Sequence, residues 1–384
     1  MRSKATRAWA EIDLGALAHN LREIRKLLRP ACRIMAVVKA DAYGHGAVEV
    51  AKAALRAGAS WLGVATLDEA LVLRRSGIKG RILIIGPIDV ADLAAAARGR
   101  ISVTIGSMEF IDALERLGRR LPRVQFHLKV DTGMTRFGVM AADAARAISR
   151  LKQARVTLEG CYTHLSSADE PGRGFTEGQL DGFSRVLDLV RRGFPKAAIH
   201  AASSAGVFAY PTSHFDVVRI GIAMYGLQPS PHVRSPAALR PVMRLLSRVV
   251  RVVRVPAGTA VGYGATYRTR AQTSIATVAC GYADGYPRLA GIQGEVAIRG
   301  RRYPIAGRLS MDYLAADVGN SEVAADDEVE LFGVQISADE VASWAHTISY
   351  EILTRIGPRV PRIYVTKKGS VTSHESRVTN HESR

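Results

Sequence analysis

Residues 33–46 read RIMAVVKADAYGHG, a short apolar run that ends on Lys39 and then becomes polar and glycine-containing. The apolar, β-rich residues 34–38 predict a buried strand. A lysine at the end of such a strand can be partly desolvated, which would lower the pKa of its amine and let the nitrogen form a Schiff base with a carbonyl. Lys39 is therefore the first catalytic candidate, although most lysines at strand ends are solvated caps.

Strand and helix patterns alternate around this stretch. The spacing of apolar residues predicts a helix over 14–28, capped by Asp13, and another over about 47–57. Seven further strand-like runs follow: 61–65, 81–85, 101–105, 124–130, 156–163, 199–202 and 217–222. Eight strands that alternate with helices predict a (β/α)8 barrel. A doubly wound open sheet is the alternative, but no GxGxxG motif opens the first unit.

A different pattern begins after residues 227–241, where four prolines predict a linker. Strand-like runs then follow one another with few helices between them: 245–255, 273–279, 295–299, 313–318, 328–332 and 362–366. We expect a barrel over 11–230 and a mainly antiparallel β domain over 231–368, with helices near 338–356. Residues 1–10 could add a strand to the β domain. The polar residues 369–384 predict a disordered tail.

Composition excludes several classes of protein. The net charge of +18 comes from scattered arginines without a nucleic-acid-binding motif, so we expect no nucleic-acid partner. No apolar run approaches 18 residues and the N-terminus lacks an apolar signal core, which predicts a cytoplasmic protein that does not bind membranes. Cys32, Cys161 and Cys280 are widely spaced and predict reduced thiols rather than a metal site.

The barrel prediction locates the chemistry, because active sites of this fold lie at the C-terminal ends of the strands. The residues expected there are Lys39, Tyr43, Asp131, Arg136, His164, Ser203, Ser204, Arg219 and Gly221. HAASSAG (residues 200–206) and RIGIAMYG (residues 219–226) follow the last two strands, where barrel enzymes commonly bind a phosphate. A phosphate site beside a Schiff-base lysine indicates pyridoxal 5'-phosphate (PLP) as the cofactor.

Eight motifs, in this order, resemble those of the alanine racemases, which are PLP enzymes with a barrel and a β domain. The motifs are AVVKADAYGHG, HLKVDTGMTRFG, THLSSADE, RIGIAMYG, VGYGATY, GYADGYPR, GRLSMDY and SYEILTRI. The resemblance covers the chain from about residue 9 to 366. It is far more specific than a single fingerprint would be.

The resemblance implies how the cofactor is held. Lys39 would carry PLP as a Schiff base and Arg219 would face the pyridine nitrogen. A protonated arginine donates a hydrogen bond there and makes the ring a weaker electron sink, which suits a racemase. The phosphate would be held by Tyr43, Ser204, Gly221, Ile222 and Tyr350. Ser203 stands where the family often has asparagine.

Racemisation moves protons on both faces of one carbon, so two bases are needed. The resemblance implies that these are Lys39 and Tyr263 of the partner subunit, which makes the protein a homodimer with shared sites. His164 and Arg136 would lower the pKa of that phenol. The substrate carboxylate would be received by Arg136 and by the backbone N–H of Met311.

Further residues would support the site or form its entrance. Lys129 matches a position that is carbamylated in some family members and steadies the arginine, and Asp312 is a second supporting residue. The entrance would consist of Tyr263, Tyr350, Ile348, Arg288, Arg308 and Asp169.

We therefore expect a racemase that interconverts L- and D-alanine and supplies D-alanine for peptidoglycan. A racemase of serine, of basic amino acids or of a broader set is an alternative. A PLP-dependent decarboxylase of similar architecture is less consistent, because Cys280 does not match that family's cysteine motif. A noncatalytic PLP carrier would ordinarily lack the second domain.

Overall fold

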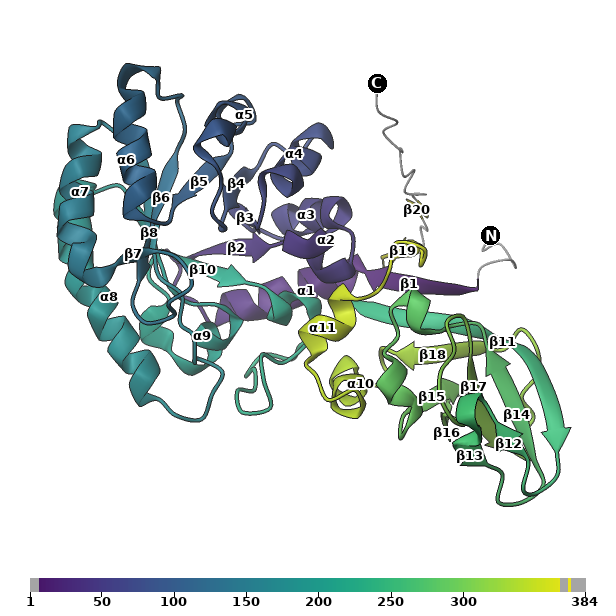
Figure 1. Ribbon diagram of the computed structural model, residues 1–384. Coiled ribbons are helices and arrows are strands. Elements are labelled where there is room, and N and C mark those ends of the chain that lie inside the picture. Colours follow the sequence, from purple (N-terminus) through teal and green to yellow (C-terminus); the bar gives the residue numbers. More distant parts are fainter. Residues whose placement is uncertain (1–6, 367–371, 374–384) are drawn as a thin grey trace. The chain divides into compact units, whose positions relative to one another are not determined.

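The computed structural model describes residues 7–366 and 372–373, and within them the chain forms two compact units (Figure 1). The barrel unit consists of Leu17–Ala42 and Ala47–Arg240. The β unit contains Tyr43–Gly46 together with the described parts of Met1–Ala16 and Pro241–Arg384. The segment that follows the first barrel strand is thus divided between the two units.

Eight parallel strands form a closed ring in the barrel unit. In order around the ring they are β2 (Arg33–Val37), β3 (Trp61–Val64), β4 (Arg81–Ile84), β5 (Ser102–Ile105), β6 (Phe126–Asp131), β8 (Leu158–Tyr162), β9 (Ala198–His200) and β10 (Val217–Ile220). The ring closes because β5 pairs with β6 and β10 pairs with β2. The short β7 (Val139–Met140) adds to β6. The predicted (β/α)8 barrel is confirmed.

One helix precedes the first barrel strand and others connect the strands (Figure 1). They are α1 (Leu14–Lys26), α2 (Lys39–Gly44), α3 (Ala47–Arg56), α4 (Leu67–Arg75), α5 (Leu93–Arg98), α6 (Met108–Leu117), α7 (Ala144–Gln153), α8 (Gly174–Gly193) and α9 (Ser204–Ala209). Local sequence starts several of them. The Asp13 carboxylate accepts a hydrogen bond from the Ala16 N–H at 2.9 Å, and Thr66 with Glu69 forms a capping box on α4.

The barrel strands are buried along nearly their whole length. One hydrophobic cluster in the barrel consists of Met35, Trp61, Leu83, Ala198 and Val217. Charged and polar side chains are nevertheless buried on the same strands, which is costly unless they are hydrogen-bonded. These residues are His127, Lys129, Asp131, His200 and Arg219. Such burial points to a site inside one end of the barrel.

The β unit is built on one nine-stranded sheet. Its main order is β16 (Arg301–Pro304), β15 (Glu295–Ile298), β18 (Glu328–Phe332), β11 (Met243–Val255), β1 (Ala8–Asp13), β19 (Arg362–Val365) and β20 (Thr372–Ser373), and β14 (Thr273–Val278) pairs with β11 and with β17 (Leu314–Gly319). All pairings are antiparallel except that of β1 with β19. The mainly antiparallel prediction is therefore confirmed.

Some elements of the β unit are not evident in the sequence. The hairpin strands β12 (Ala260–Val261) and β13 (Tyr267–Arg268) have two residues each, and the strand β16 has four residues that include two arginines. Two helices, α10 (Ala338–Trp344) and α11 (Ser349–Thr354), occupy the region where helices were predicted. The predicted tail over 369–384 lies outside the described residues, apart from Thr372–Ser373, which pair with β19.

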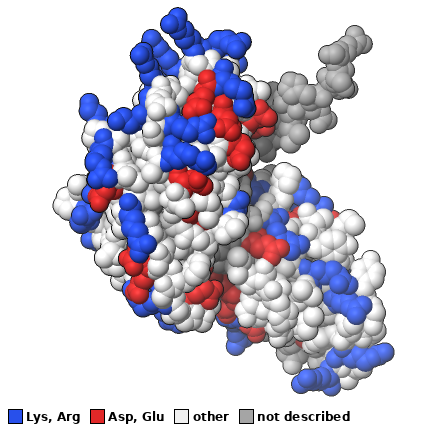
Figure 2. All heavy atoms as spheres, turned by 60° about the vertical axis from the view of Figure 1, so that its left-hand side comes forward, with Lys and Arg blue, Asp and Glu red and all other residues white. Residues whose placement is uncertain are grey.

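Within the described parts of the chain, we find no helix that combines the length and the apolar character needed to cross a bilayer. Figure 2 shows a face on which Lys and Arg side chains are dispersed, with Asp and Glu among them. The three cysteine thiols are buried and form no disulfide.

Candidate active site

Lys39 is the first residue of α2, directly after the apolar end of β2. The Val38 N–H bonds to the carbonyl of Gly63 on the neighbouring β3 at 2.8 Å, so the chain leaves the barrel at a fixed point. The lysine side chain is partly buried. Burial and then the nearby Arg136 charge lower the pKa of Lys39, while Glu69 opposes them. This amine is therefore easier to deprotonate than an ordinary lysine.

The turn after Lys39 is left-handed. Four consecutive residues, Ala40, Asp41, Ala42 and Tyr43, have φ between 51° and 55°, followed by Gly44 at 77°. Each non-glycine residue in this conformation costs about 1–2 kcal/mol, so the surroundings must stabilise it. The Ala40 N–H donates to the Glu69 carboxylate at 2.7 Å, and the Asp41 carboxylate accepts from the Ala47 N–H at 2.7 Å.

Within the β unit, glycines at the end of this turn allow a close approach. A Cβ on Gly44 would lie 2.4 Å from the carbonyl oxygen of Leu353, and one on Gly46 would lie 1.8 Å from the hydroxyl of Tyr364. Tyr43 is buried, which raises its pKa to about 12, and its ring lies 6.1 Å from that of Tyr350.

Arg219, on β10, is buried at the same end of the barrel unit. Its guanidinium donates to His200 at 2.9 Å and to His164 at 3.0 Å, and to the carbonyls of Thr163 and Ala201 at 2.9 and 2.7 Å. Burial lowers the pKa of Arg219 to about 10, so it stays protonated at neutral pH. Burial, then the charge of Arg219, lowers the pKa of His164 well below its usual range, so this imidazole is a neutral acceptor.

Ser204 and Gly221 bring two helix starts together. The Ser204 hydroxyl oxygen accepts from the N–H of Gly221 at 3.2 Å and from the N–H of Ala223 at 3.3 Å. The hydroxyl thereby ties the start of α9 to the 3₁₀ turn Ile222–Tyr225. Ser203 precedes α9 as its cap residue but forms no side-chain cap bond. Backbone N–H groups at such helix starts are the usual ligands of a phosphate.

Asp131 organises the loop that carries Arg136. At the end of β6, its Oδ1 accepts from the N–H groups of Gly133, Met134 and Thr135 at 2.9, 2.9 and 3.1 Å, and its Oδ2 accepts from the N–H of Arg136 at 3.3 Å. The sequence singled out Asp131 as a strand-end residue, and the structure gives it this scaffolding role.

Lys129 lies beneath the same loop. Its ammonium donates to the Phe137 carbonyl and lies 3.9 Å from the centroid of the Phe137 ring, while the Arg136 guanidinium lies 5.6 Å from that centroid. Burial lowers the pKa of Lys129 to about 8, with Asp131 opposing this effect. Lys129 is thus packed against the arginine loop.

The site in the barrel unit carries an excess of positive charge. The charges of Lys39, Lys129, Arg136 and Arg219 all act to lower the pKa of His164. A group of cations gathered at the ends of buried strands creates a positive potential that attracts anionic ligands. Phosphate and carboxylate groups are therefore the expected partners of this site.

The β unit presents its own predicted residues on an exposed surface. Tyr263 is 69% exposed, and it lies between Gly262 and Gly264, both of which have a φ of 73°. It lines a pocket of about 350 Å³ together with Arg308, Ser310 and Tyr313, among others. Met311 is 53% exposed.

Asp312 anchors the loop that carries Met311. Its carboxylate accepts from the Arg359 guanidinium at 2.7 Å, and its carbonyl accepts from Arg7 at 2.5 Å. The hydrogen bond from Arg359 lowers the pKa of Asp312. The remaining entrance candidates differ in exposure: Ile348, Arg288 and Arg308 are exposed, Tyr350 and Asp169 are partly buried.

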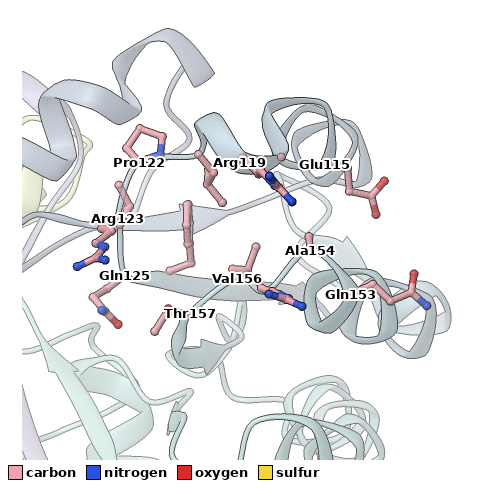
Figure 3. Close-up of a pocket in the computed structure, with 14 residues that line it drawn as sticks. Glu115, Arg119, Pro122, Arg123, Gln125, Gln153, Ala154, Val156 and Thr157 are labelled. Carbon is pink, nitrogen blue, oxygen red and sulfur yellow. The ribbon is translucent and has the colours of Figure 1, made fainter.

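A second pocket, of about 840 Å³, opens at the other end of the barrel (Figure 3). It is lined by residues that precede β6 and β8, including Arg119, Arg123 and Thr157. Because catalytic groups of this fold lie at the C-terminal strand ends, we do not assign the active site there.

Two family models match the chain. They are the alanine racemase N-terminal domain over residues 12–229 and the alanine racemase C-terminal domain over residues 242–364. The chain belongs to the alanine racemase family.

Relatives in this family are similar over nearly the whole chain. A protein of Symbiobacterium thermophilum named alanine racemase is 45% identical over 364 residues, which are 93% of this chain and 96% of the relative. One of Desulfovibrio desulfuricans is 43% identical, covering 93% of this chain and 98% of its own.

Solved alanine racemases share the fold. The enzyme of the D-cycloserine producer Streptomyces lavendulae has a TM-score of 0.87 at 41% identity, covering 94% of this chain and 97% of its own. That of Bartonella henselae, solved with covalently bound pyridoxal phosphate, has a TM-score of 0.85 at 31% identity, covering 94% of this chain and 100% of its own.

Sequence reasoning about this alanine racemase family member missed the residues behind the site. Glu69, Glu159 and Tyr162 stand in none of the eight motifs, and His127 is the first residue of HLKVDTGMTRFG but received no role. One signal was available: β6 reads FHLKVD, so His127, Lys129 and Asp131 share one face of a strand that is buried throughout.

Proposed function

We propose that this protein is a PLP-dependent racemase that interconverts L-alanine and D-alanine. The observation that carries the proposal is the cation cluster around Lys39, which includes a buried arginine whose four hydrogen-bond acceptors among the described residues are neutral. PLP brings one phosphate and the substrate brings one carboxylate, and both are anions that this cluster can receive.

The residues present fit PLP. A lysine amine of lowered pKa suits the carbon–nitrogen bond to the cofactor aldehyde. Gly221 and Ile222 lie at the start of a 3₁₀ turn, where N–H groups suit phosphate oxygens. Ser204 supplies a hydroxyl beside them, and Tyr43 and Tyr350 are the further phosphate ligands that we propose. When bound, PLP withdraws the electrons left behind when the Cα–H bond breaks.

We assign the proton transfers to two side chains. Lys39 takes or returns the Cα proton on one face, and Tyr263 of the partner subunit does so on the other. In the single chain Tyr263 is 69% exposed, which suits a side chain that acts in another subunit. The protein would therefore be a homodimer.

Arg136 and the backbone N–H of Met311 would hold the substrate carboxylate. The loop fixed by Asp131 presents Arg136, and Lys129 packs against that loop. Since burial lowers the pKa of Lys129 to about 8, part of this amine is neutral near pH 7.5. A neutral amine is the form that reacts with carbon dioxide, so we include a carbamylated Lys129 in the proposal.

Asp169, Arg288, Arg308 and Ile348 would limit the size of the substrate side chain. A role in supplying D-alanine for peptidoglycan, in the cytoplasm, completes the proposal. A cysteine-dependent decarboxylase receives no support from Cys280, because burial raises the pKa of its thiol well above the usual range.

Solvent-deuterium exchange at Cα tests the function. Purified protein with PLP is incubated in D₂O with L-alanine, D-alanine, L-serine or L-lysine, and the products are separated by chirality. Inversion of alanine in strong preference to the other amino acids is expected. Preference for another amino acid would change the assigned substrate but not the mechanism. The absence of both exchange and inversion would refute the racemase function.

A further inference from the structure

A continuous chain of hydrogen bonds runs through the barrel interior behind Arg219. The Arg219 guanidinium bonds to His200 Nδ1 at 2.9 Å, and His200 Nε2 bonds to His127 Nδ1 at 2.9 Å. His127 Nε2 then lies 3.3 Å from the Glu159 carboxylate. The chain therefore connects the arginine of the proposed site with an acidic residue near the start of β8.

Arg219 at one end of this chain and Glu159 at the other favour the same direction of hydrogen bonding. A guanidinium can only donate, so whenever His200 Nδ1 bonds to Arg219 it accepts and the His200 proton is on Nε2. His200 then donates to His127 Nδ1, which places the proton of His127 on Nε2, where it donates to Glu159. Both imidazoles are neutral in this arrangement, because burial lowers the pKa of His127 and of His200.

Packing holds the two imidazole rings in place. The His200 ring is stacked on the Tyr162 ring, with centroids 4.6 Å apart and an angle of 12° between the planes. His127 occupies the space above Gly160, where a Cβ would lie 2.3 Å from His127 Nδ1. Both histidines are at most 1% exposed, so water does not replace these bonds at the surface.

Glu159 is the negatively charged end of this hydrogen-bonded chain. Its carboxylate also accepts from the Ser102 hydroxyl at 2.5 Å and lies 3.5 Å from the Arg81 guanidinium. Burial alone would raise the pKa of Glu159, but hydrogen bonds from His127 and Ser102 lower it overall. Arg219, at the other end, bonds within the described part of the chain to two imidazoles and two carbonyls, which are all neutral.

We propose that Glu159 is a positioning residue for the racemase reaction. Its negative charge, together with the Arg219 donor at the other end, sets the tautomers of His127 and His200, so that a lone pair of His200 faces Arg219 and holds the guanidinium protonated and in one orientation. If the chain reversed, a His200 N–H would point at an Arg219 N–H, and the arginine would move. This proposal rests on the proposed function for the part that concerns catalysis.

The first test reads the tautomers by ¹⁵N NMR of histidine-labelled holoprotein. We expect His127 and His200 to carry their protons on Nε2 in the wild type. In Glu159→Gln the amide can accept from or donate to His127, so we expect mixed tautomers at both rings. A proton on Nδ1 of either ring in the wild type overturns the proposal, as does a Glu159→Gln spectrum equal to the wild type.

The second test separates positioning from simple structural loss. Glu159→Gln removes one negative charge that acts on Arg219 through the two histidines. We expect this variant to lower kcat for alanine on the order of tenfold. KM should stay within about twofold, because the substrate carboxylate is assigned to other residues. An unchanged kcat, or a rise in KM alone, would contradict the proposal.

Two further variants provide controls. Glu115→Gln removes the same charge from a surface pair with Arg150 and should change neither the histidine spectrum nor kcat. Ser102→Ala keeps the Glu159 carboxylate and should preserve the tautomers, while a full reversal in this variant would transfer the role to Ser102. If the wild type does not racemise alanine, the NMR result still decides whether Glu159 orders the chain.

Discussion

Replacing Ala40 by glycine should stabilise the protein, which is unusual for a residue that the structure places in a helical turn. Ala40 is exposed and has a φ of 52°, so its Cβ makes little favourable contact and its backbone is in the left-handed region. Relief of that strain is worth about 1–2 kcal/mol. The greater freedom of glycine in the unfolded chain removes about 0.5–1 kcal/mol of this. We therefore expect a net gain of about 0–1.5 kcal/mol.

A matched substitution at Ala94 serves as a control for the direction of the change in unfolding free energy. Ala94 is also exposed but lies in the right-handed helix α5, where glycine should cost about 0.5–1 kcal/mol. The free energies of unfolding of Ala40→Gly, Ala94→Gly and the wild type would be compared in urea, with PLP at one fixed concentration. If Ala40→Gly were destabilised as much as Ala94→Gly, the left-handed turn at Lys39 would be refuted.

Three other predictions use the same structure. Gly46→Ala should destabilise the β unit by more than about 2 kcal/mol in urea unfolding, because the new Cβ would overlap the Tyr364 hydroxyl, and an unchanged midpoint would contradict this contact. Tyr263→Phe should impair Cα exchange from one enantiomer far more than PLP absorbance; equal loss for L- and D-alanine would exclude its one-sided role. Burial lowers the pKa of Lys129 to about 8 in the folded protein, whereas an ordinary lysine has a pKa of about 10.4. Between these two pH values the unfolded chain keeps a proton on Lys129 that the folded chain has lost, so stability rises with pH in that window. In CO₂-free buffer, the advantage of Lys129→Met over the wild type in unfolding free energy should therefore shrink from pH 7 to pH 10, and a constant difference would show that Lys129 is not penalised by burial.

Local sequence was sufficient for most of the fold. The eight barrel strands and the cap at Asp13 were predictable because apolar periodicity and caps depend on residues close together in the chain. The ordered motifs were also sufficient to identify the family, since each lies within about a dozen residues. The strand β16 and the hairpin β12–β13 were missed because strands of two to four residues are too short to show periodicity.

Only the tertiary structure decided what surrounds the candidate site. Ala40, Asp41, Ala42 and Tyr43 have no intrinsic preference for a left-handed turn, and the turn forms where Glu69 and other distant groups bond to it. In the same way, Glu159, His127, His200 and Arg219 come from four strands that are far apart in the sequence. These four residues form one hydrogen-bonded chain because the closed barrel brings their strands together. No local sequence pattern encodes contacts between such distant residues.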